Sequence, residues 1–230
     1  MIKWLIIVVS VLLFAVVFLP LVADVPPLNS LGLVASKYVS DGPNELGGSN
    51  IVTSIVVIYR GLDTLGEVTV LFLATAGIGF ILRKKKSGLS DSARPSSEIL
   101  QTASSFLFPL LAMFGVYVFI HGHLTPGGGF QGGVIIASGV LLLMLSDVSI
   151  KLNHLVLDSV ESLSGAFYVS IGLLGLFLAA GFLDSRFLPL GRYGALFSAG
   201  AIPLIYSFIG LKVGSELTGI LDNMTTGNEQ

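Results

Sequence analysis

The fold is decided by residues 117–135, which read YVFIHGHLTPGGGFQGGVI. This stretch joins two long apolar runs through a short, glycine-rich connection that contains no Asp, Glu, Lys or Arg. Such a connection predicts a tight turn between two helices, in which glycines permit unusual backbone angles. The alternative is non-helical backbone at membrane depth, which is tolerated only where protein or a water-filled cavity covers it.

Composition points to a membrane protein. The chain has 230 residues, of which 53% are hydrophobic and 11% charged, and its mean hydropathy is +0.90. A soluble domain carries about 25% charged residues. With a net charge of -2 and no basic patch among aromatics, nucleic acid is not an expected partner. Cysteine is absent, which excludes disulfides and thiolate-held metals, and we expect no metal and no cofactor.

The apolar runs predict an all-α, polytopic transmembrane helix bundle in the cell membrane, in contact with the lipid bilayer. A membrane-spanning helix needs about 20 mostly apolar residues. The expected spans are residues 4–23, 64–82, 99–120, 131–145, 163–183 and 194–212.

Three further segments are expected around these spans. Residues 51–59 are too short to cross alone and predict a half-helix before Gly61; the alternative is one long helix from Ile51 that breaks near Gly61. Residues 147–162 carry an apolar stripe at helical spacing, which predicts a helix lying in the membrane interface. Residues 215–230 are expected to form a polar tail.

Two units and one orientation follow from the polar segments. The serine-rich stretch Ser87 to Ser97 is linker-like, and it divides a unit over residues 1–97 from a unit over residues 98–230. Lysine and arginine favour the cytoplasmic side. Both termini are therefore predicted to be cytoplasmic, on the side that collects most of these residues: Lys3, Arg83, Lys84, Lys85, Lys86, Arg94, Lys151 and Lys212.

The carboxylates Asp63 and Glu67 have two interpretations. Thr64 and Glu67 stand at the spacing of a capping box before an apolar run, in which case Glu67 caps its own helix and Asp63 pairs with Arg60. In the other interpretation these carboxylates face a water-filled path, because ionisable groups inside membranes are costly and usually mark ion pathways.

His121, His123 and Lys212 are the other candidates for an ion path. Both histidines follow an apolar helix, where loop carbonyls could satisfy them or where they could relay protons, since histidine titrates near physiological pH. Lys212 is either an anchor whose ammonium reaches the cytoplasmic interface at a helix end, or the buried partner of a carboxylate of a neighbouring subunit.

The scarcity of charge argues against transport by this chain alone. Residues 68–82, 99–120 and 163–183 contain no charged residue, and the spans after residue 98 are expected to hold no acidic residue at their centres. A self-sufficient cation transporter normally needs one. We therefore expect a non-catalytic accessory subunit; the alternatives are a purely structural scaffold and an independent small transporter.

Residues 98–222 resemble the B subunit of the multisubunit Mrp-type (Mnh) cation/proton antiporters. The resemblance is carried by HGHLTPGGGFQGG at residues 121–133, by LFSAGAIPL at residues 196–204 and by GLKV at residues 210–213. It implies four membrane spans in this part and a role in Na+/H+ exchange by a hetero-oligomer.

The segment RGLDTLGE at residues 60–67 resembles the C-terminal part of the large A subunit of the same antiporters. In membrane-bound hydrogenases and related archaeal complexes that part is a separate small subunit. The resemblance implies a fusion of two neighbouring subunits, with Na+, H+ and other antiporter-module subunits as partners. In a redox-coupled respiratory complex it also implies a hydrogenase-like peripheral arm. The residues expected to contact partner subunits are Arg60, Pro126, Gly127, Gly128, Gly129, Phe130 and Gln131.

Overall fold

The computed structural model describes residues 2–23, 31–82, 96–147, 150 and 152–226, and every regular element in these ranges is a helix. Six helices of the described ranges are long and apolar enough to cross a membrane, which confirms the expected all-α bundle. They are α1 (Ile2–Ala23), α4 (Gly61–Leu82), α5 (Glu98–Ile120), α6 (Gly129–Ser146), α7 (His154–Leu178) and α8 (Ile202–Thr226). The linker at residues 87–97 lies largely outside the described residues.

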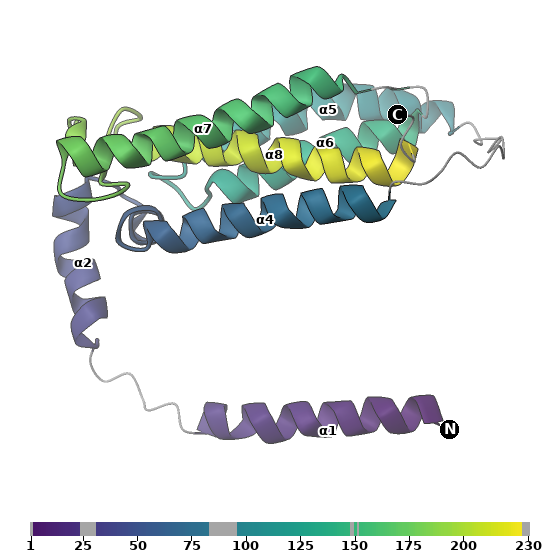
Figure 1. The fold of residues 1–230 in the computed structure, drawn as a ribbon, viewed down its shortest axis with the longest axis horizontal. Coiled ribbons are helices and arrows are strands. Elements are labelled where there is room, and N and C mark those ends of the chain that lie inside the picture. The colour runs from purple at the N-terminus through teal and green to yellow at the C-terminus, as the bar shows by residue number, and fades with distance from the viewer. Residues whose placement is uncertain (1, 24–30, 83–95, 148–149, 151, 227–230) are drawn as a thin grey trace. The chain divides into compact units, whose positions relative to one another are not determined.

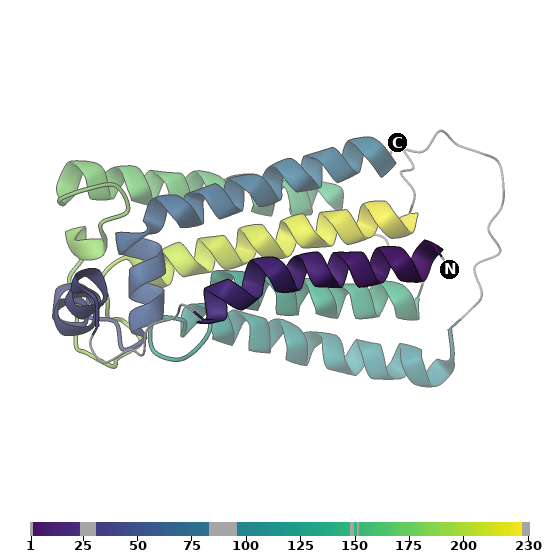
Figure 2. The ribbon, with the colours of Figure 1, turned by 90° about the horizontal axis from the view of Figure 1, so that it is seen from below.

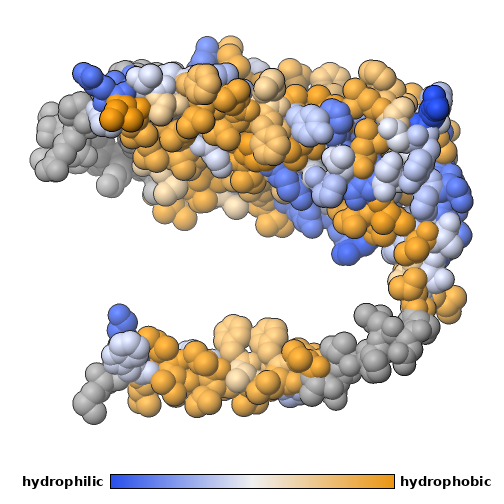
Figure 3. Space-filling view, turned by 180° about the vertical axis from the view of Figure 1, so that it is seen from behind, coloured by the Kyte–Doolittle hydropathy of each residue, from blue (hydrophilic) through white to orange (hydrophobic). Residues whose placement is uncertain are grey.

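The chain forms two compact units, residues 1–37 and residues 38–230. Helix α1 belongs to the first unit and is apolar along most of its length, with Lys3 in its first turn (Figure 3). Nearly all of its described side chains are exposed, including Trp4 and Phe14. A helix that is hydrophobic all round is typical of a membrane span.

In the second unit, α8 runs along the middle of the bundle (Figures 1 and 2). It packs against α4, α5, α6 and α7, and α5 and α6 form another close pair. One face of α8 supplies the core, because Ile202, Ile205, Ile209 and Val213 recur every three or four residues and are all buried. This spacing places them in one stripe of the helix.

Glycines let α6 approach its neighbours closely. A Cβ at Gly132 would stand 2.5 Å from the carbonyl oxygen of Gly115 in α5, and one at Gly133 would stand 2.8 Å from that of Gly210 in α8. Both separations are shorter than van der Waals contact. The second half of the glycine motif therefore packs inside the chain, as expected for a tight helical connection.

The short half-helix before Gly61 is present. It consists of α3 (Ile51–Ser54) and the π-helix η1 (Ile55–Tyr59), and Asn50 caps its start by accepting a hydrogen bond from the Thr53 amide. The wide i to i+5 turn continues to Arg60, whose amide donates to the carbonyl of Ile55 at 2.8 Å. Only Arg60 separates η1 from α4, so the alternative of one long helix from Ile51 that breaks near Gly61 also describes this segment.

The prediction of a separate interfacial helix over residues 147–162 is wrong. From His154 onward the chain is one continuous helix, α7, which ends at Leu178 instead of residue 183. Polar residues suggested the membrane surface at this point. In the structure Glu161 instead lies near Lys212 of α8, a contact between segments far apart in the sequence.

The predicted span over residues 194–212 is wrong at both ends, since α8 covers Ile202–Thr226. Gly194, Ala199 and Gly200 have φ angles of 80°, 64° and 59°, which belong to the left-handed region and exclude a helix there. Pro203 occupies the first turn of α8, where proline is tolerated. Residues 215–226 of the expected polar tail continue the helix, and residues 227–230 lie outside the described residues.

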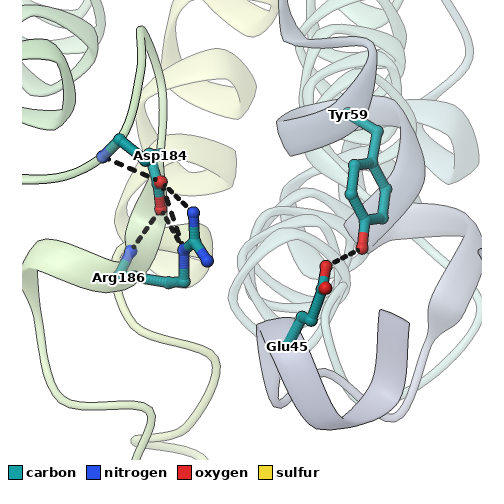
Figure 4. Close-up of polar contacts among 5 residues, drawn as sticks. Glu45, Tyr59, Asp184 and Arg186 are labelled. Carbon is teal, nitrogen blue, oxygen red and sulfur yellow. Dashed lines mark hydrogen bonds and ion pairs between the residues drawn. The ribbon is translucent and has the colours of Figure 1, made fainter. Parts of the chain in front are cut away.

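Two polar pairs hold the end of the second unit where the loops gather (Figure 4). Arg186 donates to Asp184 at 2.6 Å, and Tyr59 donates to Glu45 at 2.5 Å. The hydrogen bonds from Arg186 hold the pKa of Asp184 below its usual value. Burial, followed by the Glu45 carboxylate, raises the pKa of Tyr59.

Candidate functional site

The first candidate site is a cavity of 430 Å³, which we call the Glu67 pocket. It lies where the half-helix, the start of α4, the glycine connection and α8 meet, so it joins the two segments that the motifs singled out. Its lining residues are Asn50, Val52, Thr53, Val56, Thr64, Glu67, Pro126, Gly127, Phe130, Gln131 and Tyr206.

The polar atoms of this pocket are mostly oxygen. The Thr53 hydroxyl donates to the carbonyl of Gly122 at 2.7 Å, and the Thr64 hydroxyl donates to the carbonyl of Val56 at 2.8 Å. Because each hydroxyl proton is already used, both oxygens can only accept further hydrogen bonds, and the Thr53 oxygen also has a hydrogen bond with the side chain of Tyr206. Together with the Glu67 carboxylate they form the kind of hard oxygen set that alkali and alkaline-earth cations bind.

Glu67 is not a helix-capping residue. Helix α4 begins at Gly61, so Thr64 lies inside the first turn and bonds Val56 instead of capping, and the capping-box interpretation is wrong. The expected pair of Asp63 with Arg60 is present at 2.8 Å, with both side chains more than half exposed. Glu67 is exposed on the isolated chain although it lies within a membrane span. An ionised carboxylate facing lipid is costly.

Asn50 ties the half-helix to the glycine connection. Its side-chain amide donates to the carbonyls of Gly122 and Thr125, both at 2.9 Å, and its backbone amide donates to the carbonyl of His123 at 2.9 Å. Pro126 and Gln131 remain exposed, whereas Gly128 and Gly129 are buried and Phe130 packs against the core of its own chain. Only part of the glycine motif is therefore accessible for contact with a partner subunit.

The two histidines have different surroundings. His121 stacks on Tyr117 with ring centroids 4.1 Å apart, and its Nδ1 lies 3.1 Å from the carbonyl of Tyr117. His123 is fully buried, with Nε2 at 3.4 Å from the carbonyl of Ala195. Burial lowers the pKa of His123, which favours its neutral form.

The second site, which we call the Lys212 cluster, consists of Lys212, Glu216 and Glu161. Lys212 Nζ lies 2.8 Å from Glu216 Oε1 on α8 and 3.9 Å from Glu161 Oε1 on α7. The side chains are 12%, 0% and 21% exposed in that order. The ammonium also sits 5.1 Å from the ring centroid of Phe72 on α4.

Sequence reasoning missed Glu161 and Glu216 and misplaced Lys212. Lys212 is the eleventh residue of the 25-residue α8, not its end. Asp222 also lies within a span, 3.4 Å from His154. The expectation that the spans after residue 98 hold no acidic residue at their centres is therefore wrong for α8, because Glu216 is the fifteenth of its 25 residues. A signal was available, since Lys212 and Glu216 are four residues apart, the spacing of a helical ion pair.

The fold defines the chain as a multi-pass membrane protein. Residues 99–219 match the family described as a domain related to the MnhB subunit of Na+/H+ antiporter, and residues 7–99 match the family of the MBH protein MbhE. The chain belongs to the MnhB family, and it is a membrane subunit of an Mrp-type antiporter or of a related respiratory complex.

Three similar proteins support this assignment. A chain in the structure of the membrane-bound sulfane sulfur reductase, an archaeal respiratory membrane complex, is 42% identical with a TM-score of 0.83, and the match covers 97% of this chain and 98% of that one. A chain of the Mrp complex from Dietzia sp. DQ12-45-1b is 23% identical with a TM-score of 0.77, over 99% of this chain and 26% of that one, which shows the shared fold.

The third is the probable A/B subunit of a K+/H+ antiporter from Rhizobium meliloti, 27% identical over 137 residues. The match covers 49% of this chain but only 14% of the rhizobial protein.

Proposed function

We propose that this chain is a non-catalytic membrane subunit that lines part of a cation path in an Mrp-type antiporter module and helps to assemble that module. The observation that carries the proposal is the Glu67 pocket, in which a carboxylate and hydroxyl oxygens inside the membrane bundle face one cavity. Na+ is the expected substrate, with H+ moving in exchange. The exposed Pro126 and Gln131 are proposed to contact the neighbouring subunit.

The position of Glu67 supports this proposal. On the isolated chain the carboxylate is exposed, yet the helix that carries it is apolar enough to span the membrane. Such a group needs a water-filled path or a partner subunit beside it. Either neighbour suits a subunit that works inside a larger complex.

The pocket also explains why two motifs occur in one chain. Residues 50–67 supply one wall and residues 126–131 supply the other, so the cavity is complete only when both segments are present. We propose that the chain is a fusion of two neighbouring subunits, over residues 1–97 and 98–230. The rhizobial relative carries the designation A/B, which fits a joining of the same two subunits.

The proposal is tested by Glu67→Gln in the assembled complex, reconstituted into liposomes. Loss of a charged ligand costs about 1.5–3 kcal/mol, so we expect a drop of about tenfold or more in cation-driven proton movement. Asp63→Asn is the matched control, because Asp63 lies one turn away and pairs with Arg60 on the surface. Replacing Na+ with K+ in the same assay identifies the ion. Unchanged exchange in Glu67→Gln would contradict the proposal.

A purely structural role is the second candidate, and the close packing of α6 favours it. Gly132 and Gly133 admit no side chain without a shift of backbone in α5 or α8. If the chain is only a scaffold, Gly133→Ala lowers the yield of assembled complex, and the complex that does assemble exchanges ions with unchanged rate and selectivity.

The parent complex is either a free antiporter or a redox-coupled respiratory complex. The 42% identity to a chain of the sulfane sulfur reductase complex favours the second setting. The subunits that copurify with this chain distinguish the two settings, because a redox-coupled complex would include a peripheral arm with its own cofactors. The cytoplasmic placement of both termini stays a prediction, and Lys212 no longer supports it, since this residue lies within a span.

A further inference from the structure

We propose that the Lys212 cluster is a proton-binding site within the membrane, at which one exchangeable proton is shared by Glu161 and Glu216 on either side of Lys212. The site is separate from the Glu67 pocket, whose lining contains none of these three residues. Its ligand is the proton itself.

The cluster lies deep in the bundle. At about 1.5 Å per residue, Lys212 and Glu216 stand about 15 Å and 21 Å along α8 from Ile202. The hydrocarbon core of a bilayer is about 30 Å thick. Both residues belong to α8, which is long and apolar enough to cross this core. Glu161 belongs to α7, which is also long and apolar enough to cross it.

The charges of the cluster do not balance. One ammonium faces two carboxylates, which leaves one negative charge in excess when all three groups are ionised. The helices packed against α8 supply few further charges. Asp158 of α7 acts electrostatically on Glu161, and α4 contributes the ring of Phe72 and carries Asp63 and Glu67 near its start. His154 of α7 lies 3.4 Å from Asp222 of α8, and in α5 and α6 the charged residue is Glu98 at the start of α5.

One atom of the cluster lacks a partner. Glu216 is completely buried, and its Oε2 has no hydrogen-bond partner among the described residues. A buried, unpaired carboxylate oxygen is costly in a medium of low dielectric. A bound proton removes both defects, since it cancels the excess charge and turns one carboxylate into a hydrogen-bond donor.

The cluster also has a route for exchange with its surroundings. Glu161 is 21% exposed, whereas Glu216 is sealed, and Lys212 lies between them. Gly165 of α7 leaves room for the lysine, because a Cβ there would stand 3.5 Å from its Nζ. Glu161 Oε1 lies 3.9 Å from Lys212 Nζ, so proton transfer needs this oxygen to move within hydrogen-bond distance. A proton held as an O–H bond on Glu161 then passes to the lysine as the lysine gives one of its own to Glu216.

The test is infrared spectroscopy of the purified parent complex during a pH titration, in which the band of the protonated carboxyl reports bound protons directly. We expect Glu161→Gln and Glu216→Gln each to abolish this titrating band, because either change removes the excess charge. We expect Lys212→Met to move the titration to higher pH, because it removes the positive charge that competes with the proton.

Asp158→Asn is the matched control, since it is an exposed carboxylate on α7 and should leave the band in place. If the complex with Glu216→Gln does not assemble, Glu161→Gln still provides the test, because Glu161 is partly exposed whereas Glu216 is buried. A band that persists unchanged in either glutamine variant, or that does not move in Lys212→Met, would overturn the proposal. Glu67→Gln leaves the band intact whatever its effect on transport, so failure here is distinguishable from failure of the cation path.

Discussion

The Glu67 pocket and the Lys212 cluster both place carboxylates in helices that cross the membrane, but they stabilise those carboxylates differently. The pocket leaves Glu67 open and surrounds it with hydroxyl oxygens whose protons are already donated elsewhere. The cluster buries Glu216 and compensates it with the ammonium of Lys212 at 2.8 Å. The two sites are neighbours, because Tyr206, which lines the pocket, and Lys212 of the cluster stand only about 9 Å apart along α8.

This difference predicts which charges contribute to binding of an ion or a partner subunit and which contribute to the stability of the fold. A charge that is compensated inside the protein contributes to folding, so its loss should be felt by the whole bundle. A charge that is left open for a ligand or a partner subunit contributes little to the isolated fold, so its loss should be felt by transport. The first two of the following variants test this distinction directly, and the last two measure ion pairs outside both sites.

The largest effect is expected for Lys212→Met measured alone. It leaves Glu161 and Glu216 facing each other without a counter-charge, and breaking a buried pair in this way costs about 3–5 kcal/mol. The double variant Lys212→Met with Glu216→Gln removes both charges and should recover most of that loss. The measurement is the melting temperature of the detergent-solubilised complex. Equal melting temperatures for the single and double variants would show that the pair is not compensated as the distances imply.

A smaller effect is expected for Thr53→Val at the pocket. The variant keeps the shape of the side chain and removes one of two donors to the carbonyl of Gly122, which keeps the hydrogen bond from Asn50, so the cost is about 0.5–1.5 kcal/mol. It also removes an oxygen from the pocket, so the apparent affinity for the transported cation should fall. Thr69→Val is the control, since the Thr69 hydroxyl bonds only within α4. A Thr53→Val complex with unchanged cation affinity would exclude this hydroxyl from the path.

The pair of Asp184 with Arg186 predicts a modest dependence on pH. The pKa of Asp184 is depressed in the folded chain, chiefly by hydrogen bonds from Arg186, so the stabilisation is present above the ordinary aspartate value of about 3.9 and is lost as the pH falls through the folded value. Asp184→Asn should flatten the dependence of the melting temperature on pH in that acidic range. A pH profile that is identical in both proteins would mean that the pair contributes nothing.

The smallest effect is expected for Asp63→Asn. Its pair with Arg60 is exposed on both sides, and such surface pairs contribute about 0–1 kcal/mol. The melting temperature of the complex should therefore stay close to that of the unchanged protein. A large loss of assembly instead would show that a partner subunit covers the Arg60–Asp63 pair, which would support the predicted contact at Arg60.

Part of the structure could be predicted from the sequence alone, because some local patterns of residues have a direct physical consequence. Long apolar runs must cross a membrane or be buried, and the short run before Gly61 cannot do so alone, so the spans at α4 and α5 and the half-helix were predictable. The motif HGHLTPGGGFQGG and its spacing were enough to identify the antiporter B-subunit family. The pairing of Arg60 with Asp63 follows from their separation of three residues.

Only the tertiary structure determined where the charged side chains lie in the bundle. Residues 147–162 contain acidic groups that are expected at the membrane surface when they are considered by themselves, and Lys212 is expected at a helix end for the same reason. In the bundle, Glu161 and Glu216 meet Lys212 from two helices, and mutual compensation offsets the cost of their burial. The energy of an ionisable group in a membrane depends on a partner that is distant in the chain, and hydropathy along the sequence does not contain that partner.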